Sequence, residues 1–246
     1  METWLLLAAG ACAAAFVQGL AGFGFGLVAM TFWSWTLAPS LAAPAVVFGS
    51  LVGQLLAVRS LRHGLDWRRL APFLLGGLLG VPLGVGLLHY VDPAAFRLGV
   101  GLVLLVYCPA MLLAAELPRV TRGGRPADAG VGWLSGIMSG FGGLPGPALT
   151  LWCVLRGWPR DQQRAVFQTF NLVMHGVTLS SYAVAGLLDA RMVPVFAVVG
   201  GAVLVPALAG VRLYRRFSDA TFRRLVLGLL TLSGVALVVS GVRSLW

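Results

Sequence analysis

The sequence contains no lysine and few charged residues of any kind. Charged side chains make up 11% of its 246 residues, hydrophobic side chains make up 59%, and the mean hydropathy is +0.90. A soluble globular domain has about a quarter charged residues, so this composition predicts an all-α polytopic membrane protein. The absence of lysine excludes Schiff-base and lysine-nucleophile chemistry.

Cysteines and acidic residues are also scarce. Cys12, Cys108 and Cys153 lie in apolar stretches, form neither a disulfide framework nor a metal-ligand pattern, and are interpreted as small hydrophobic residues. All eight acidic residues are expected at helix ends or in loops. The sequence shows no H-E-x-x-H cluster, no buried carboxylate pair and no ATP-binding loop, so we expect no enzyme activity, no metal and no cofactor.

The basic residues are eighteen arginines, which give a formal net charge of +10. They lie in short loops between apolar segments rather than on one amphipathic face, which favours anionic lipid headgroups over nucleic acid as partners. Fifteen fall on one predicted side of the membrane and three, Arg97, Arg191 and Arg243, on the other. The positive-inside rule then predicts that both termini lie outside the cytoplasm.

Two glycine-rich clusters, at residues 19–26 and 136–147, interrupt the apolar sequence half a chain apart. Both contain Gly-Phe-Gly, at Gly22 to Gly24 and at Gly140 to Gly142. Glycine and proline interrupt helical hydrogen bonding, and backbone freed in this way must face protein or water within a membrane. Broken segments at matching places in two halves of a transporter indicate a substrate site. The alternative is that the glycines only let helices pack closely.

The pattern predicts two inverted repeats, each a broken or re-entrant helical hairpin followed by three transmembrane helices. We estimate each arm of the second hairpin at about 18 Å, too short to cross a bilayer core of about 30 Å. The expected elements are a first repeat at 1–115 (hairpin 4–37, helices 44–58, 70–90 and 96–115), a cytoplasmic linker at 116–129, and a second repeat at 130–246 (hairpin 130–155, helices 165–187, 192–211 and 222–242).

No charged side chain is expected in mid-membrane, so a bound anion would be held by dipoles and neutral polar groups. The second arm of each hairpin begins near Leu27 and near Pro147, and each helix N-terminus presents unpaired N–H groups and about half a positive charge. A polar stripe at helical spacing follows at Gln168, Asn171, His175, Thr178 and Tyr182. The candidate substrate-binding residues are Gln18, Gly22, Gly24, Gly26, Ser50, Gln54, Ser139, Gly142, Gly143, Asn171 and His175, with His175 also a candidate for proton coupling.

The alternative for the polar side chains is that they join helices by hydrogen bonds, at about 0.6 kcal/mol each. For Asn171 and Gln54 the two interpretations are equally weighted. For His175, a neutral imidazole satisfied by a neighbour is at least as well supported as a proton-coupling role.

The paired hairpins, the basic loop that ends in Gly64-Leu-Asp-Trp-Arg68, and the glycine-rich helix from Gly76 to Gly86 with its counterpart after Asp189 resemble the sulfite exporter TauE/SafE-like permeases. The resemblance covers essentially the whole chain. It implies transport of a small anion, commonly a sulfur oxyanion or organosulfonate, across the bacterial inner membrane. A secondary transporter is the first functional hypothesis. An anion channel is the alternative because hairpins also build pores, and an intramembrane enzyme is a third and weaker one.

Overall fold

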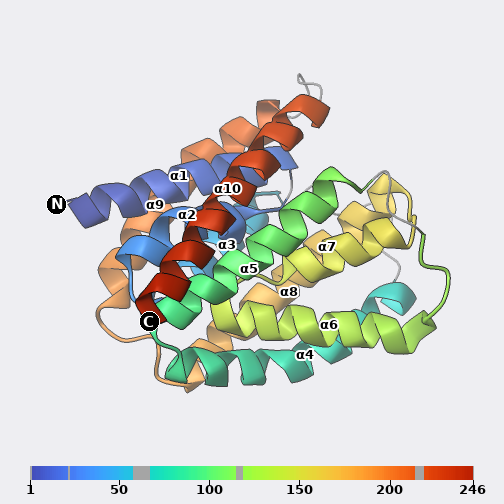
Figure 1. Cartoon of the computed structure of the whole chain (residues 1–246), viewed down its shortest axis with the longest axis horizontal. Helices are drawn as coiled ribbons and strands as arrows, with labels where there is room; N and C mark the ends of the chain where they lie inside the picture. The colour runs from blue at the N-terminus through green and yellow to red at the C-terminus, as the bar shows by residue number, and fades with distance from the viewer. Residues whose placement is uncertain (1, 22, 58–66, 115–118, 214–218, 246) are drawn as a thin grey trace.

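The computed structural model describes residues 2–21, 23–57, 67–114, 119–213 and 219–245, and within these ranges every regular element is an α-helix. Figure 1 labels each of these helices. Their bounds are α1 Glu2–Ala21, α2 Phe25–Thr36, α3 Pro39–Ala57, α4 Trp67–Tyr90, α5 Pro93–Leu112, α6 Gly124–Gly142, α7 Gly146–Leu155, α8 Arg160–Val184, α9 Met192–Leu213 and α10 Asp219–Leu245. The expected all-α fold class is confirmed.

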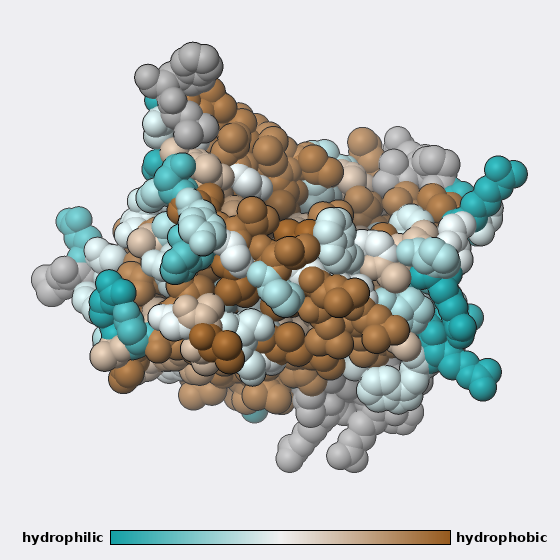
Figure 2. Space-filling model, turned by 90° about the horizontal axis from the view of Figure 1, so that it is seen from below, coloured by the Kyte–Doolittle hydropathy of each residue, from teal (hydrophilic) through white to brown (hydrophobic). Residues whose placement is uncertain are grey.

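Among the described residues, six helices are long and apolar enough to cross a membrane: α1, α3, α4, α5, α9 and α10. The surface agrees with this, since a broad region of hydrophobic side chains lies between hydrophilic side chains at both ends of the face seen in Figure 2. α8 is 25 residues long but falls outside the six. Polar residues such as Gln168, Asn171 and His175 lower its hydropathy.

The helices form two groups and a crossing pair (Figure 1). α1, α2, α3 and α9 pack together as one group, α4, α6, α7 and α8 as the other, and α3 also packs on α8 and α6 across the two groups. α5 and α10 pack on each other, both touch α2, and α5 also touches α7. Each group therefore contains one hairpin and a helix from the opposite half of the sequence. α9 packs with the first hairpin and α4 with the second, as a twofold relation between the two halves would require. That the two halves have inverted topology stays a prediction.

Glycines account for the closest helix contact, between α4 and α6. A Cβ on Gly76, Gly80 or Gly84 of α4 would overlap a backbone carbonyl of α6, and a Cβ on Gly132, Gly136 or Gly140 would overlap a carbonyl of α4. The two backbones approach this closely because neither carries a side chain at the interface. α1 and α9 meet in the same way at Gly19 and Gly210.

An alanine at Gly84 is expected to lower the melting temperature, because its Cβ would meet the Ile137 carbonyl, which is backbone and cannot yield. Overpacking of this kind costs about 1–3 kcal/mol. A Cβ on Gly86, on the same helix, would meet open space, so Gly86→Ala is the matched control. Equal thermal stability of the two variants in detergent would contradict a close α4–α6 contact.

Several expected boundaries differ from the structure, such as that of the helix expected at 44–58, which is α3 and begins at Pro39, and two of the differences bear on the helix breaks. α6 begins at Gly124, inside the expected linker, and at 19 residues is about 28 Å long rather than about 18 Å. The estimate was wrong because Pro126 suggested a loop, whereas proline is tolerated in the first helical turn. The start of that linker, residues 116–118, lies outside the described residues. α1 also continues through Gly19 to Ala21, so Gly19 serves packing against α9 and not the helix break.

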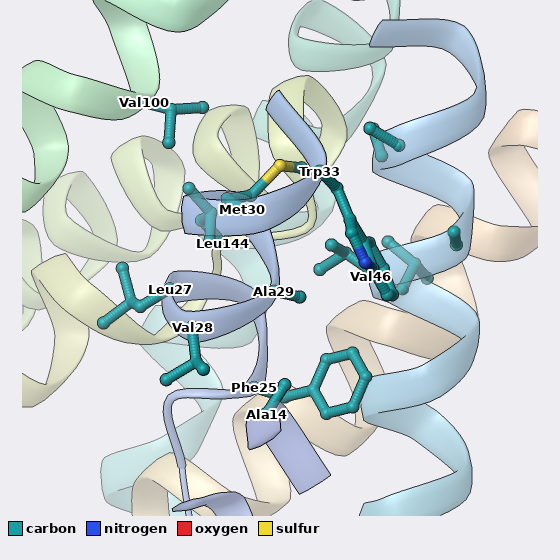
Figure 3. Close-up of a cluster of buried hydrophobic side chains, with 14 of the residues drawn as sticks. Ala14, Phe25, Leu27, Val28, Ala29, Met30, Trp33, Val46, Val100 and Leu144 are labelled. Carbon is teal, nitrogen blue, oxygen red and sulfur yellow. The ribbon is translucent and has the colours of Figure 1, made fainter. Parts of the chain in front are cut away.

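The first half of the short helix α2 lies inside the molecule, whereas Phe32, Trp35 and Thr36 toward its end are exposed. Phe25, Leu27, Ala29, Met30 and Trp33 all have at most 2% of their surface exposed. Their side chains leave α2 in several directions, and side chains of other elements surround them, as Figure 3 shows (Ala14 of α1, Val46 of α3, Val100 of α5 and Leu144 between α6 and α7). A 12-residue helix held in this way places its N-terminus deep in the protein.

Candidate substrate site at the two helix breaks

The turn between α1 and α2 meets the turn between α6 and α7. A Cβ on Gly26 would lie 2.9 Å from the carbonyl oxygen of Gly143 and 2.6 Å from the side chain of Leu144. Two segments more than a hundred residues apart are therefore in direct contact. Gly26 is needed here because any side chain would separate the turns.

Glycines with positive φ shape both turns. Gly24 has φ +95° and precedes the first turn of α2. Gly143 has φ +67° and ends α6, where its N–H donates to the Ser139 carbonyl and the N–H of Leu144 donates to the Met138 carbonyl. The bond from the Gly143 N–H to the Ser139 carbonyl is that of the αL C-cap motif, in which a left-handed residue satisfies one of the last carbonyls of a helix. Gly142, by contrast, is the last residue of α6 and is not among the positive-φ glycines.

The N-termini of α2 and α7 border a common cavity. Residues 24–27 line it from one hairpin, and residues 143–147 line it from the other. The first N–H groups of a helix have no acceptor within that helix, so both ends direct N–H groups and partial positive charge toward this region. The cavity has a volume of about 20 Å³, which is room for about one water molecule.

Five of the predicted polar residues surround the cavity: Gln18 of α1, Ser50 and Gln54 of α3, and Asn171 and His175 of α8. All five are at least 94% buried. Gln18 donates through Nε2 to the Ser50 carbonyl at 3.1 Å. Four other polar atoms of these side chains, Gln18 Oε1, Gln54 Oε1, Asn171 Oδ1 and His175 Nδ1, are buried without a hydrogen-bond partner.

Unpartnered buried polar atoms are costly, at about 1–3 kcal/mol each. Four of them converging on one cavity indicate a site built for a polar occupant. Amide side chains suit an anion, because each carries N–H donors beside its oxygen and rotation about the last torsion exchanges them. Gly53 makes room for this arrangement, since a Cβ there would overlap Gln18 Oε1.

The other predicted site residues lie away from the cavity or outside the described structure. Ser139 shares a buried hydrogen bond of 2.7 Å with Thr178, and the Tyr182 hydroxyl donates to the Gly140 carbonyl at 2.7 Å. This end of the polar stripe joins α8 to α6, as the helix-joining alternative predicts. Gly142 does not line the cavity, and Gly22 lies outside the described residues.

Phe23 is a lining residue that the sequence alone did not suggest for the site. Its ring makes edge contacts with Phe167 of α8 at 5.6 Å and with Tyr107 of α5 at 6.5 Å between centroids. The three rings connect the first turn to α5 and α8 at one side of the cavity. The signal available in the sequence was the aromatic residue between Gly22 and Gly24.

A buried carboxylate fixes the short helix α7. Asp128 of α6 is 7% exposed and accepts a hydrogen bond of 2.7 Å from Trp152 Nε1 of α7. The guanidinium of Arg156 lies over the Trp152 ring, 5.8 Å from its centroid. The expectation that every carboxylate sits at a helix end or in a loop is therefore wrong for Asp128, which is buried within α6.

Trp152→Phe is expected to lower stability, because it leaves Asp128 buried without its donor, a loss of about 1–3 kcal/mol. Trp133→Phe is the matched control, since Trp133 is an exposed residue of α6. The measurement is the melting temperature of each purified variant. If both variants melt like the parent, the Asp128–Trp152 hydrogen bond does not hold α7 in place.

The sequence profile of the sulfite exporter TauE/SafE family matches residues 6–237. The chain belongs to this family. It is 30% identical over 240 residues to a protein of Cupriavidus necator described as a probable sulfite/organosulfonate exporter TauE, and the match covers 95% of this chain and 93% of that protein. No solved structure matches the chain. TauE/SafE proteins are membrane transporters rather than enzymes, and the six long apolar helices fit that class.

Proposed function

We propose that the protein carries a small sulfur anion, sulfite or an organosulfonate, across the bacterial inner membrane. The anion is held between the N-termini of α2 and α7 by backbone N–H groups and by Gln18, Gln54, Asn171 and His175. One observation carries this proposal: four unpartnered polar atoms, all on side chains at least 94% buried, converge where two helix N-termini from opposite halves of the chain meet.

Neutral groups suit transport better than a buried cation would. A desolvated arginine binds an anion tightly, whereas conduction or transport requires that the ligand also leave. Helix N-termini provide positive potential at the site without a charged side chain. The related exporter of Cupriavidus necator is described as acting on sulfite and organosulfonates, whose sulfonyl oxygens are hydrogen-bond acceptors that match these donors.

The cavity of about 20 Å³ is too small for such an anion, so the two turns must separate for it to bind. The moving bodies follow packing rather than sequence: α1, α2, α3 and α9 against α4, α6, α7 and α8. Close glycine contacts lie within each body, whereas the contact of Gly26 with Gly143 and Leu144 lies between them. Relative rocking of the bodies would open the cavity to one side at a time.

Radiolabelled sulfite and methanesulfonate flux into proteoliposomes tests the proposal, with and without a pH gradient. Uptake that is accelerated by unlabelled anion inside the vesicles supports a transporter, and flux without such exchange supports the channel alternative. Stimulation by a pH gradient that is absent in His175→Gln supports proton coupling at His175. Vesicles that carry neither anion faster than protein-free controls would contradict the proposal.

We also propose that the arginine-rich end is cytoplasmic and that both termini are periplasmic. Cysteines introduced at Thr121 and Ala190, both exposed, should react with an impermeant reagent from opposite sides, and labelling of Thr121→Cys from the periplasm would contradict this.

At the arginine-rich end, Trp67, Arg68 and Arg125 line a groove without a carboxylate. This groove suits an anionic lipid headgroup, so phosphatidylglycerol should stabilise the protein more than phosphatidylcholine does.

A further inference from the structure

The cavity between the helix breaks has a limited positive charge. Of its fifteen lining residues, none is arginine, aspartate or glutamate, and His175 is the only side chain whose unperturbed pKa lies near neutral pH. The positive potential comes from the N-termini of α2 and α7, each equivalent to about half an elementary charge. Together they offset about one negative charge.

This value is an upper bound, because proline removes part of the donor set. Pro145 and Pro147 flank Gly146 at the start of α7, and neither has an N–H group. The C-terminus of α6, which carries the opposite partial charge, is largely satisfied: its carbonyls at Met138 and Ser139 accept from the second turn. The C-terminus of α6 therefore cancels little of the positive potential from the two helix N-termini, and no further positive group lines the cavity.

The unpartnered atoms add a second constraint. Gln18 Oε1, Gln54 Oε1 and Asn171 Oδ1 are acceptors in the arrangement that the structure shows. Any fully deprotonated anion, a sulfonate included, has only acceptor oxygens and needs these amides turned so that their N–H groups face it. A protonated oxyanion donates through its hydroxyl to one of these oxygens while its other oxygens accept from the helix N–H groups.

We infer that the site selects anions with a single negative charge: it takes sulfite in its protonated form, bisulfite, takes organosulfonates as they are, and rejects sulfate and the sulfite dianion. The inference rests on the proposed function and defines its substrate class by charge rather than by size. A second negative charge in this buried, cation-free site would be uncompensated.

Equilibrium binding to the purified protein tests this with three probes: methanesulfonate, which is always a monoanion; sulfate, a dianion at neutral pH; and sulfite, which loses its second proton near neutral pH. Methanesulfonate is expected to bind at least about 100-fold more tightly than sulfate. Above the second pKa of the ligand, the apparent affinity for total sulfite should fall by about tenfold per pH unit. Titration of His175 would act on both monoanions, so the ratio of the sulfite and methanesulfonate dissociation constants isolates ionisation of the ligand.

The outcomes separate this inference from the proposed function. Weak sulfate binding together with a sulfite-to-methanesulfonate ratio that rises with pH supports charge selection. Sulfate binding as tightly as methanesulfonate, or a ratio that stays constant with pH, overturns charge selection and leaves the anion site in place. If none of the three anions binds, the proposed function fails as well.

Discussion

Replacement of Asn171 by leucine is expected to reduce anion transport by about 10- to 100-fold while the protein still folds. Asn171 lines the cavity beside α7, with its amide nitrogen 3.3 Å from where a Cβ on Gly146 would lie. A hydrogen bond to a charged partner contributes about 1.5–3 kcal/mol, and about 1.4 kcal/mol corresponds to a factor of ten. Leucine removes this contact and also removes a buried atom that has no partner without the anion, so stability should be retained or raised.

Thr178→Val is the matched control on the same helix, two turns away. It leaves the Ser139 hydroxyl buried without its 2.7 Å partner, so it should lower the melting temperature and leave the transport rate per folded molecule unchanged. Proteoliposome flux and thermal unfolding, measured on both variants, separate the two roles. If Asn171→Leu loses folded protein in proportion to transport, Asn171 joins helices and does not bind the anion.

Replacement of Gly143 by valine is expected to abolish anion binding and to lower stability strongly. Gly143 has φ +67°, a conformation that costs a β-branched residue about 1–3 kcal/mol or more. A Cβ at Gly143 would also lie 2.7 Å from the Val46 side chain. Relief of both strains would move the turn that carries the N-terminus of α7, and with it the N–H groups proposed to hold the anion.

Neighbouring glycines supply graded controls for this prediction. Gly142→Ala adds a methyl group with ordinary contacts of 3.6 Å and no positive φ, so it should behave like the parent. Gly24→Ala keeps an open environment, with no atom closer than 3.8 Å, but occupies φ +95°, so it tests backbone strain without crowding. Equal affinity and melting temperature for Gly142→Ala and Gly143→Val would contradict the role assigned to the turn.

The sequence predicted the elements of the site better than their division between binding and packing. Glycine and proline clusters mark helix breaks because their backbone preferences are local, and the breaks were found at both places. The polar stripe on α8 follows from a 3.6-residue period, so its common face was also predictable. Which members of that face meet a cavity depends on neighbouring helices. Asn171 and His175 face α3 and the turns, whereas Thr178 and Tyr182 meet α6.

Contacts between the two halves could not be predicted from local sequence patterns. The regular spacing of glycines on α4 indicated close packing. That α6 is the partner of α4, and that α4 and α9 each pack with the hairpin of the other half, depends on the tertiary fold. The buried Asp128 was missed for a related reason: its partner, Trp152, lies on the other arm of the hairpin. A carboxylate is acceptable there only because that indole donates to it.

A structure of the protein with bound 2-bromoethanesulfonate would test the central claim most directly, because anomalous scattering from bromine locates the ligand without reference to its surroundings. The sulfonate is predicted to lie between the N-termini of α2 and α7, with its oxygens within hydrogen-bond distance of N–H groups near Gly26 and Gly146 and of the Asn171 side chain. The volume of the cavity in that structure should exceed the present value of about 20 Å³. A bound ligand located elsewhere, with this cavity still closed, would contradict the account.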